Sequence, residues 1–173
     1  MEIPLYLVHL KEDDPKRCTA AELRKFRIVK YVRFAKGVIL DPFSNTLLSP
    51  PDKVLAERSG ITVIDGSWER IAFGIRKVKG KGVRRSLPFL LASNPTNYAI
   101  GRKLSTAEAF AATLYILGWK YLAEKIMNYF KWGHTFFQLN LSALELYSKA
   151  KDLEEIKAYE EEVMSRPQDF FKV

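Results

Sequence analysis

Apolar residues in the first half of the chain gather in short runs of strand length, and residues that favour turns follow them. These runs cover residues 3–10, 28–32, 37–40, 61–65 and 87–93. An apolar run of four to eight residues between turn signals is typical of a buried strand, and runs separated by helical patterns favour an α/β fold. The pattern therefore predicts about five strands, and the run that ends in Asp65 is expected to be central.

Helical patterns separate these runs and become continuous near residue 105. Thr19 with Glu22, and Ser105 with Glu108, form Ser/Thr-x-x-Glu capping boxes, which start helices. The other expected helices follow Ser49 and Ser67 or cover residues 119–129, 136–149 and 152–164.

The two kinds of pattern occupy different parts of the chain. We expect an N-terminal α/β domain over residues 1–92 and a C-terminal helical domain over residues 93–173 that completes the site. The stretch from Leu87 to Glu108 joins them, since an apolar run leads through Asn94-Pro95 into a helix start. Ligands of open α/β proteins bind beyond the carboxyl ends of strands, and helix N-termini attract anions. This stretch is a candidate site, although an ordinary strand-to-helix connection has the same pattern.

Composition limits the class of protein. With 173 residues, of which 47% are hydrophobic, the chain is long enough to bury a core. No apolar run approaches the 18 residues of a membrane-spanning helix. The lone Cys18 excludes an intramolecular disulfide and a Cys-x-x-Cys zinc site, and it fits a reducing cytoplasm.

Charge is distributed unevenly along a chain whose formal net charge is +8. No Asp or Glu occurs between Arg70 and Ala107, whereas the last helical stretch is rich in glutamate. This asymmetry indicates one basic face for a polyanion such as RNA. The candidate RNA-binding residues lie in the first helix and in the loop expected over residues 74–85: Arg24, Lys25, Arg76, Lys77, Lys79, Lys81, Arg84 and Arg85. A solvated surface loop fits this composition equally well.

Motifs of several enzyme classes are missing from the sequence. Gly80-Lys81-Gly82 is not followed by Ser or Thr and so does not form a Walker A loop, and no third glycine completes a dinucleotide fingerprint. There is no Gly-x-Ser-x-Gly elbow, and Cys18 has no evident histidine partner. His9 and His134 are the only histidines and lack the spacing of metal ligands, so no metal is expected.

Three polar or aromatic residues have two possible roles each. Asp65 ends a predicted buried strand, where α/β proteins gather polar groups, or it caps the next helix. Trp68 is a core aromatic or stacks on a base. Thr19 caps a helix or offers its hydroxyl to a ligand carboxylate.

Six short motifs occur together in order along the chain: Asp14-Pro15-Lys16-Arg17-Cys18-Thr19, Leu40-Asp41-Pro42-Phe43-Ser44, Asp65-Gly66-Ser67-Trp68, Leu87-Pro88 with Asn94-Pro95-Thr96-Asn97-Tyr98, Leu104-Ser105-Thr106-Ala107-Glu108-Ala109 and Phe130-Lys131-Trp132-Gly133. This combination resembles the family of small-subunit ribosomal RNA aminocarboxypropyltransferases of archaea and eukaryotes, from Ile3 to about Tyr147. Gly66 stands where many members have Cys, and Ser93 and Ala99 also depart from common residues.

The resemblance implies a SPOUT-like knotted fold, with an N-terminal α/β half of about five strands, an all-helical C-terminal half and a trefoil knot at the cofactor site. It implies S-adenosylmethionine as cofactor and transfer of its 3-amino-3-carboxypropyl group. The acceptor is N3 of a uridine or pseudouridine, often already methylated, in small-subunit rRNA near the decoding site. Methylthioadenosine is released. The implied protein is a cytoplasmic monomer whose partner is the rRNA or a pre-ribosomal particle.

The resemblance also assigns the cofactor-binding residues. Thr19 is expected to hold the carboxylate of the aminocarboxypropyl group, the Ile64 carbonyl the ribose hydroxyls, and backbone groups of Leu87 and Arg102 the adenine edge. Thr106 is expected at the helix start facing the cofactor tail. The apolar slot around the base is formed by Leu40, Pro42, Trp68, Leu104 and Ala109.

The acceptor N3–H is a weak acid, so a base assists the transfer, and Asp65 is our hypothesis for that base. Electrostatic stabilisation of the sulfonium is its rival role. Two other functions stay open from the sequence: an S-adenosylmethionine-dependent RNA methyltransferase of the SPOUT type, and a non-catalytic rRNA-binding assembly factor.

Overall fold

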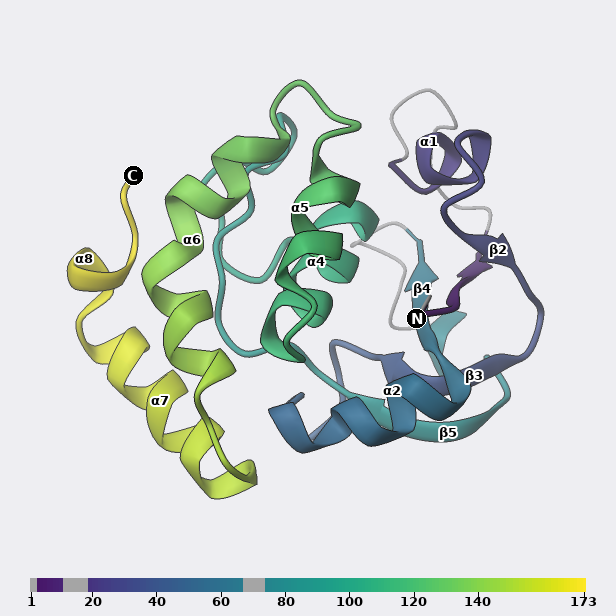
Figure 1. The fold of residues 1–173 in the computed structure, drawn as a ribbon, viewed down its shortest axis with the longest axis horizontal. Helices are drawn as coiled ribbons and strands as arrows, with labels where there is room; N and C mark the ends of the chain where they lie inside the picture. Colours follow the sequence, from purple (N-terminus) through teal and green to yellow (C-terminus); the bar gives the residue numbers. More distant parts are fainter. Residues whose placement is uncertain (1–2, 11–18, 67–73) are drawn as a thin grey trace.

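The structure, a computed structural model, describes residues 3–10, 19–66 and 74–173 (Figure 1). The expected helix after Ser67, the predicted slot residue Trp68 and the motif 14–18 lie outside the described residues. None of the helices in the described ranges is both long and apolar enough to cross a membrane.

Five parallel strands form one sheet. They are β1 (Leu5–His9), β2 (Lys30–Tyr31), β3 (Ala35–Leu40), β4 (Ile61–Asp65) and β5 (Gly80–Arg85). Their order is β2-β1-β4-β3-β5, and every pair is parallel. β4 is therefore central, as its uninterrupted apolar sequence predicted.

Both faces of the sheet are buried, because alternate residues of each strand enter different clusters. Leu7 and Val63 belong to the large core under the helices, whereas Val8 and Ile64 belong to a smaller cluster on the other face. Ile75 belongs to that smaller cluster, so the chain just before β5 covers the second face.

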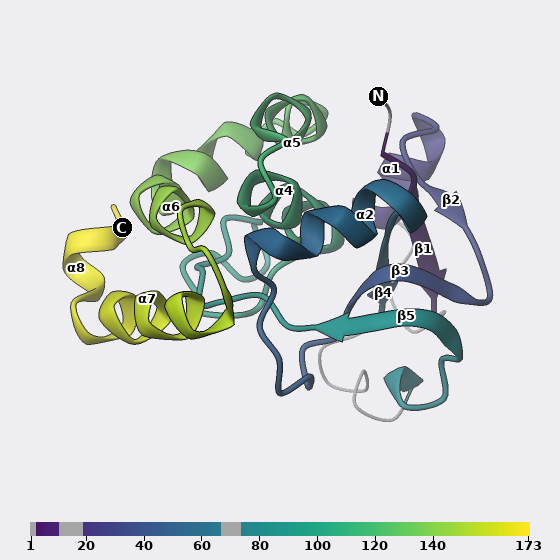
Figure 2. The ribbon, with the colours of Figure 1, turned by 60° about the horizontal axis from the view of Figure 1, so that its bottom comes forward.

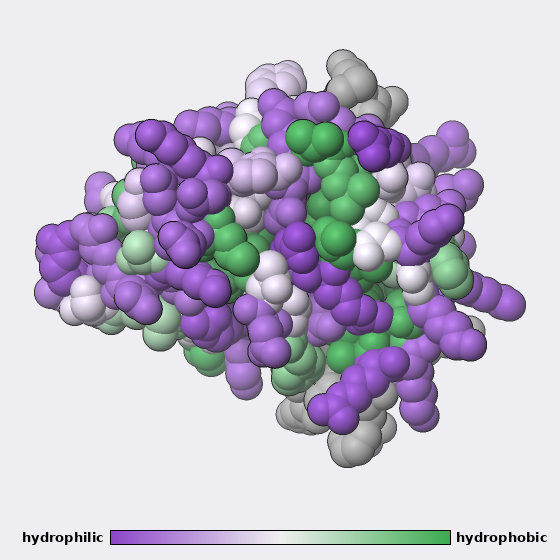
Figure 3. All heavy atoms as spheres, turned by 90° about the horizontal axis from the view of Figure 1, so that it is seen from below, coloured by the Kyte–Doolittle hydropathy of each residue, from purple (hydrophilic) through white to green (hydrophobic). Residues whose placement is uncertain are grey.

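Helices cover the first face and extend away from it. The first three are α1 (Thr19–Lys25), the 3-10 turn η1 (Pro50–Asp52) and α2 (Lys53–Ser59). The later ones are α4 (Thr106–Ile116), α5 (Lys120–Met127), α6 (Gly133–Ser148), α7 (Leu153–Ser165) and α8 (Pro167–Phe170). Figure 1 shows α4 and α5 between the sheet and α6 to α8. From below, most of the visible surface is hydrophilic, with narrow apolar bands (Figure 3).

The predicted fold class, a SPOUT-like knotted fold with an all-helical C-terminal half, is wrong. The molecule is a small α/β domain in which the later helices share one core with the sheet: Leu7 and Val63 of the strands join Phe110 of α4, Leu144 of α6 and Val163 of α7. α4 packs against β4 and α1 (Figure 2), and all of its residues except Ala109 are buried. A helix that is apolar on every side needs partners all round. Within the described residues, no strand pairing or contact shows a knot.

The strand predicted over residues 87–93 is also wrong. Leu91 forms an isolated bridge with Gly101, and helix side chains bond other backbone groups of this stretch. Asn140 of α6 accepts from the Leu91 amide and donates to its carbonyl, each at 2.9 Å. Tyr147 of α6 donates to the Phe89 carbonyl. Buried backbone groups need partners, and here helix side chains replace the ladder of a sheet.

The fifth strand lies instead in the stretch expected to be a basic loop. β5 is polar and pairs along its whole length with β3, from Ala35–Gly80 to Leu40–Arg85. Gly82 has φ +156°, and a Cβ there would lie 2.0 Å from the Gly37 carbonyl oxygen. This close approach requires glycine. Because β5 contains no apolar run, the hydrophobic pattern of the sequence could not predict it.

The other expected elements are confirmed with shifted ends. The predicted strands 3–10, 28–32 and 61–65 contain β1, β2 and β4, and β3 starts two residues before the predicted strand 37–40. α6 starts at Gly133, three residues before its predicted start. The short α8 was not predicted.

Candidate active site

The carboxyl ends of the parallel strands bring polar side chains to one edge of the sheet. β4 ends at Asp65, and β1 ends at His9, its direct partner in register. Leu40 ends β3 and pairs with Arg85, the last residue of β5. Leu87 follows two residues later. Residues of four segments, among them the predicted Leu40, Asp65 and Leu87, therefore converge on this edge, as expected for an open α/β sheet.

Asp65 is held from two sides. Its side chain is largely buried, with the residue 7% exposed. Thr106, the first residue of α4, donates a short hydrogen bond from Oγ1 to Asp65 Oδ1. His9 Nε2 lies 3.5 Å from Asp65 Oδ2. The carboxylate is therefore fixed by a hydroxyl and an imidazole, in an environment where a charge is poorly screened.

His9 is a site residue that sequence reasoning considered only as a metal ligand. Its ring stacks on Tyr31 of β2 with centroids 5.8 Å apart and planes 9° apart. The Arg24 guanidinium lies 4.3 Å from the centroid of the same tyrosine ring. In the sequence, the position of His9 at the end of a predicted buried strand was the one available signal for a site role. The sequence did not show that β1 and β4 are neighbours, so it could not place His9 beside Asp65.

The N-terminus of α4 meets the N-terminus of α1 at the same edge. Thr19 Oγ1 accepts a hydrogen bond from the Ala107 amide at 3.0 Å. A hydroxyl that accepts in this way can still donate its own proton. Thr19 and Thr106, 87 positions apart in the sequence, thus flank one helix start, where N–H groups favour an anion.

Glu108 organises the loop that leads into α4. The capping box with Ser105 is present, as predicted. The same carboxylate also accepts from the Ser93 amide at 2.6 Å, the Ser93 hydroxyl at 2.9 Å and Asn94 Nδ2 at 2.7 Å. Glu108 is completely buried. Sequence spacing revealed the cap but not these contacts, because they cross a loop whose path was unknown.

The segment proposed to read adenine is held by the later helices. Glu160 of α7 accepts from the Phe89 amide at 2.9 Å. Burial raises the pKa of Tyr147 far above its ordinary value, so its phenol stays a donor to the Phe89 carbonyl. Arg102 has φ +65°, and its amide donates to the Leu90 carbonyl. Its side chain points outward, with Nη2 3.4 Å from Glu160 and the guanidinium 5.3 Å from the Phe89 ring centroid.

The residues predicted to line the apolar slot, and Leu87 and Ile64, which were predicted to bind through backbone groups, differ in burial. Leu40 and Leu104 are buried, and Leu87 and Ala109 are half-buried. Pro42 is exposed in the turn after β3. Ile64 is buried, with its side chain in the cluster on the opposite face of the sheet.

The predicted RNA-binding residues fall into three groups. Arg24 and Lys25 are exposed on α1, beside the carboxyl edge. Arg76, Lys77, Lys79 and Lys81 are exposed, but Lys81 pairs with Lys36 near the amino end of β3, the opposite edge.

The two arginines at the end of β5 bond within the protein. Arg84 Nη1 lies 3.1 Å from Asp41 Oδ2, and its Nη2 donates to the Val78 carbonyl. Arg85 Nε lies 3.1 Å from Asp52 Oδ2.

Comparison with known proteins identifies relatives over nearly the whole chain. The family model described as "Ribosome biogenesis protein, C-terminal" matches residues 38–164. A protein of Sulfurisphaera tokodaii named 16S rRNA aminocarboxypropyltransferase is 46% identical over 162 residues, which cover 94% of this chain and 96% of that protein. A protein of the same name from Methanosarcina mazei is 42% identical and covers 90% and 91%.

A solved structure has the same architecture. The SAM-dependent rRNA:acp-transferase Tsr3 from Vulcanisaeta distributa superposes with a TM-score of 0.81 at 35% sequence identity, covering 98% of this chain and 100% of that one. With matches of this length and identity, the chain belongs to the family of 16S rRNA aminocarboxypropyltransferases.

Proposed function

We propose that this protein is an S-adenosylmethionine-dependent transferase that moves the 3-amino-3-carboxypropyl group onto a nucleotide of small-subunit rRNA during ribosome biogenesis. Its relatives' names supply the reaction. The observation in this chain that carries the proposal is the buried Asp65, held by Thr106 and His9 beside the start of α4.

The residues at this edge fit the chemical groups of S-adenosylmethionine. A sulfonium and an ammonium are cations, which a buried carboxylate such as Asp65 attracts. The carboxylate of the same cofactor needs donors, which Thr19 and the start of α4 offer. The buried side chains of Leu40 and Leu104 suit an apolar base.

Bound S-adenosylmethionine supplies three carbons on one sulfonium, and the carbon presented in line to the acceptor is the one that reacts. In the proposed transfer, a bond forms between N3 of a uridine or pseudouridine and the methylene carbon of the aminocarboxypropyl group. The bond from that carbon to sulfur breaks, and its electron pair stays on sulfur, which releases methylthioadenosine. We propose that Asp65 receives the N3 proton; stabilising the sulfonium is its other proposed role.

The proposal extends to the substrate's context. We place the acceptor in small-subunit rRNA near the decoding site and the enzyme in the cytoplasm, acting as a monomer. Support for a polyanionic substrate comes from the formal net charge of +8.

The test combines purified protein, immature small-subunit rRNA and S-adenosylmethionine, and identifies the small product by mass spectrometry. Methylthioadenosine together with an aminocarboxypropylated nucleotide is expected. S-adenosylhomocysteine would instead mean a methyltransferase. Tight cofactor binding without any product from naked rRNA or from assembling particles would contradict the transfer.

A further inference from the structure

Two exposed aromatic rings stack on each other where α1 meets the turn after α5. Phe26 is 43% exposed and Tyr129 is 37% exposed. Their centroids lie 4.6 Å apart, with planes 29° apart. Isolated surface aromatics need no explanation, whereas adjoining exposed apolar groups form a patch that a partner can cover.

Basic side chains are frequent in the segment that carries Phe26, although Lys36, at the far end of that segment, pairs with Lys81 at the opposite edge of the sheet. Residues 23–40 contain no Asp or Glu. They carry six exposed basic residues: Arg24, Lys25, Arg27, Lys30, Arg33 and Lys36. Lys25 Nζ lies 5.9 Å from the Phe26 centroid, and the exposed Lys131 follows Tyr129 closely. Aromatic faces among cations are the composition that binds single-stranded nucleic acid.

The backbone fixes the first ring in place. α1 ends with Arg27 in the left-handed region at φ +59°. The Ile28 amide donates to the Leu23 carbonyl, and the Arg27 amide to the Arg24 carbonyl. These two bonds form a Schellman turn that encloses Phe26, so Phe26 stands on an ordered helix end.

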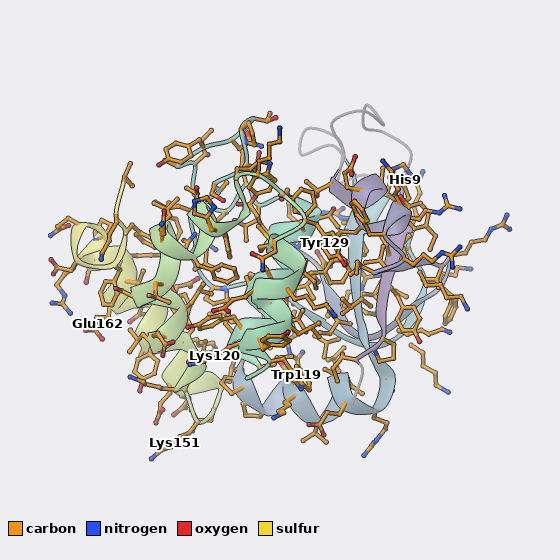
Figure 4. The ribbon with its side chains drawn as sticks, turned by 45° about the horizontal axis from the view of Figure 1, so that its top comes forward. His9, Trp119, Lys120, Tyr129, Lys151 and Glu162 are labelled. Atoms are coloured by element: carbon orange, nitrogen blue, oxygen red, sulfur yellow. The ribbon has the colours of Figure 1, made fainter. Side chains whose placement is uncertain are left out.

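The pair lies on the side of the molecule that carries the proposed active site. A chain of contacts runs from Asp65 to His9, from His9 to Tyr31, and from Tyr31 to Arg24 on α1. Figure 4 shows Tyr129 at the end of α5 nearer His9, whereas Trp119 and Lys120 lie at the other end of that helix. The predicted basic residue Lys81, by contrast, lies at the opposite edge of the sheet.

We propose that Phe26 and Tyr129 form a stacking platform for an unpaired base of the substrate rRNA, next to the nucleotide that is modified. The inference rests on the proposed function and deepens it, because it states that the RNA bound beside the active site is single-stranded. The surrounding cations contact its phosphates, and the rings contact a base without selecting its identity.

The test measures binding of a fluorescently labelled single-stranded RNA of about 12 nucleotides, a length within the usual site sizes, and of its duplex. Phe26→Ala and Tyr129→Leu are expected to weaken binding of the single strand roughly 5- to 150-fold, the range of one lost base stack, and to affect the duplex little. Tyr129→Phe keeps a ring and is expected to bind normally.

Tyr121→Ala is the matched control, because Tyr121 is 80% exposed in the first turn of α5, away from the pair. S-adenosylmethionine affinity and the unfolding transition are measured on every variant and are expected to stay unchanged. Two outcomes would overturn the stacking platform while leaving the proposed function standing. One is an equal loss of single-strand and duplex binding in the ring variants. The other is an active enzyme in which neither ring variant loses binding. A parent protein that neither binds RNA nor forms product overturns the proposed function with it.

Discussion

Glu108 holds the loop from Ser93 to Ser105 through a buried carboxylate that accepts from both serines and from Asn94. Glu108→Gln replaces one acceptor oxygen by an NH₂ group that faces donors. We expect a loss of about 2–4 kcal/mol in the free energy of unfolding, since bonds to charged groups are strong and a buried donor is left unpaired. Chemical denaturation measures it, and Glu161→Gln, at an exposed position of α7, serves as comparison. A loss below that of the comparison would contradict this role of Glu108.

Asp65 is the residue on which the chemistry is proposed to depend. Asp65→Asn keeps the shape of the side chain and removes its capacity to accept a proton. We expect turnover to fall roughly 10²- to 10⁴-fold, the usual contribution of a general base. S-adenosylmethionine is expected to bind more weakly but still measurably, because the variant loses the charge that attracts its cationic groups. Single-turnover kinetics and calorimetry check this. Asp152→Asn, at the start of α7, is the control, and unchanged turnover in Asp65→Asn would exclude the role of base.

At the scale of elements, three helices meet in one polar cluster. Tyr115 of α4 donates to Glu145 of α6, and Lys120 of α5 lies 3.0 Å from the same carboxylate. The hydrogen bond from Tyr115, and then that from Lys120, lowers the pKa of Glu145. Burial, and then the bond to Glu145, raises the pKa of Tyr115.

These shifts predict how stability depends on pH. A lowered folded pKa gives Glu145 a stabilising effect that is present above its ordinary pKa of 4.5 and is lost as the pH falls through the folded value. Tyr115 stabilises below pH 10, and its effect is lost as the pH rises further. Glu145→Gln is expected to flatten the acid limb of the stability curve, by less than about 1 kcal/mol because the pair is partly exposed. Denaturation across the pH range measures this, and an unchanged acid limb would contradict it.

Helices and strands were predictable where the residues of a single segment determine its secondary structure. The capping box at Ser105, the start of a helix at Thr19 and the apolar run of β4 depend on local spacing, and the structure contains them. β5 was missed because Gly80–Arg85 forms a strand only through its pairing with β3. The run 87–93 was misassigned because Asn140 and Tyr147, distant in sequence, satisfy its backbone.

The site was predictable to the same extent. Asp65 stood out because it ends a buried strand, and Thr106 was named only through the family resemblance. Their hydrogen bond, and the position of His9, depend on strand order and helix packing, which composition and periodicity do not contain. Family resemblance supplied the cofactor but also an incorrect fold class.

At the scale of the whole molecule, the net charge predicts RNA binding that depends on salt. Lys77→Glu, Lys79→Glu and Lys81→Glu together are expected to weaken rRNA binding and to flatten the plot of log affinity against log salt if these residues contact phosphates. The matched control carries Lys149→Glu, Lys151→Glu and Lys157→Glu, which change the charge equally on exposed positions of the C-terminal region. Equal effects of the two triple variants would indicate net charge alone and contradict a local contact.

The side-chain bonds to residues 89–94 have a consequence for the order in which the molecule opens. Irregular segments usually exchange their amide hydrogens quickly, because they open without disturbing the core. Here the amides of Leu91 and Ser93 bond to Asn140 and Glu108, which are both fully buried. Their release requires α4 and α6 to separate from the segment. Deuterium exchange at these two amides is therefore expected to be as slow as global unfolding, so that the segment 89–94 opens only when the whole domain does.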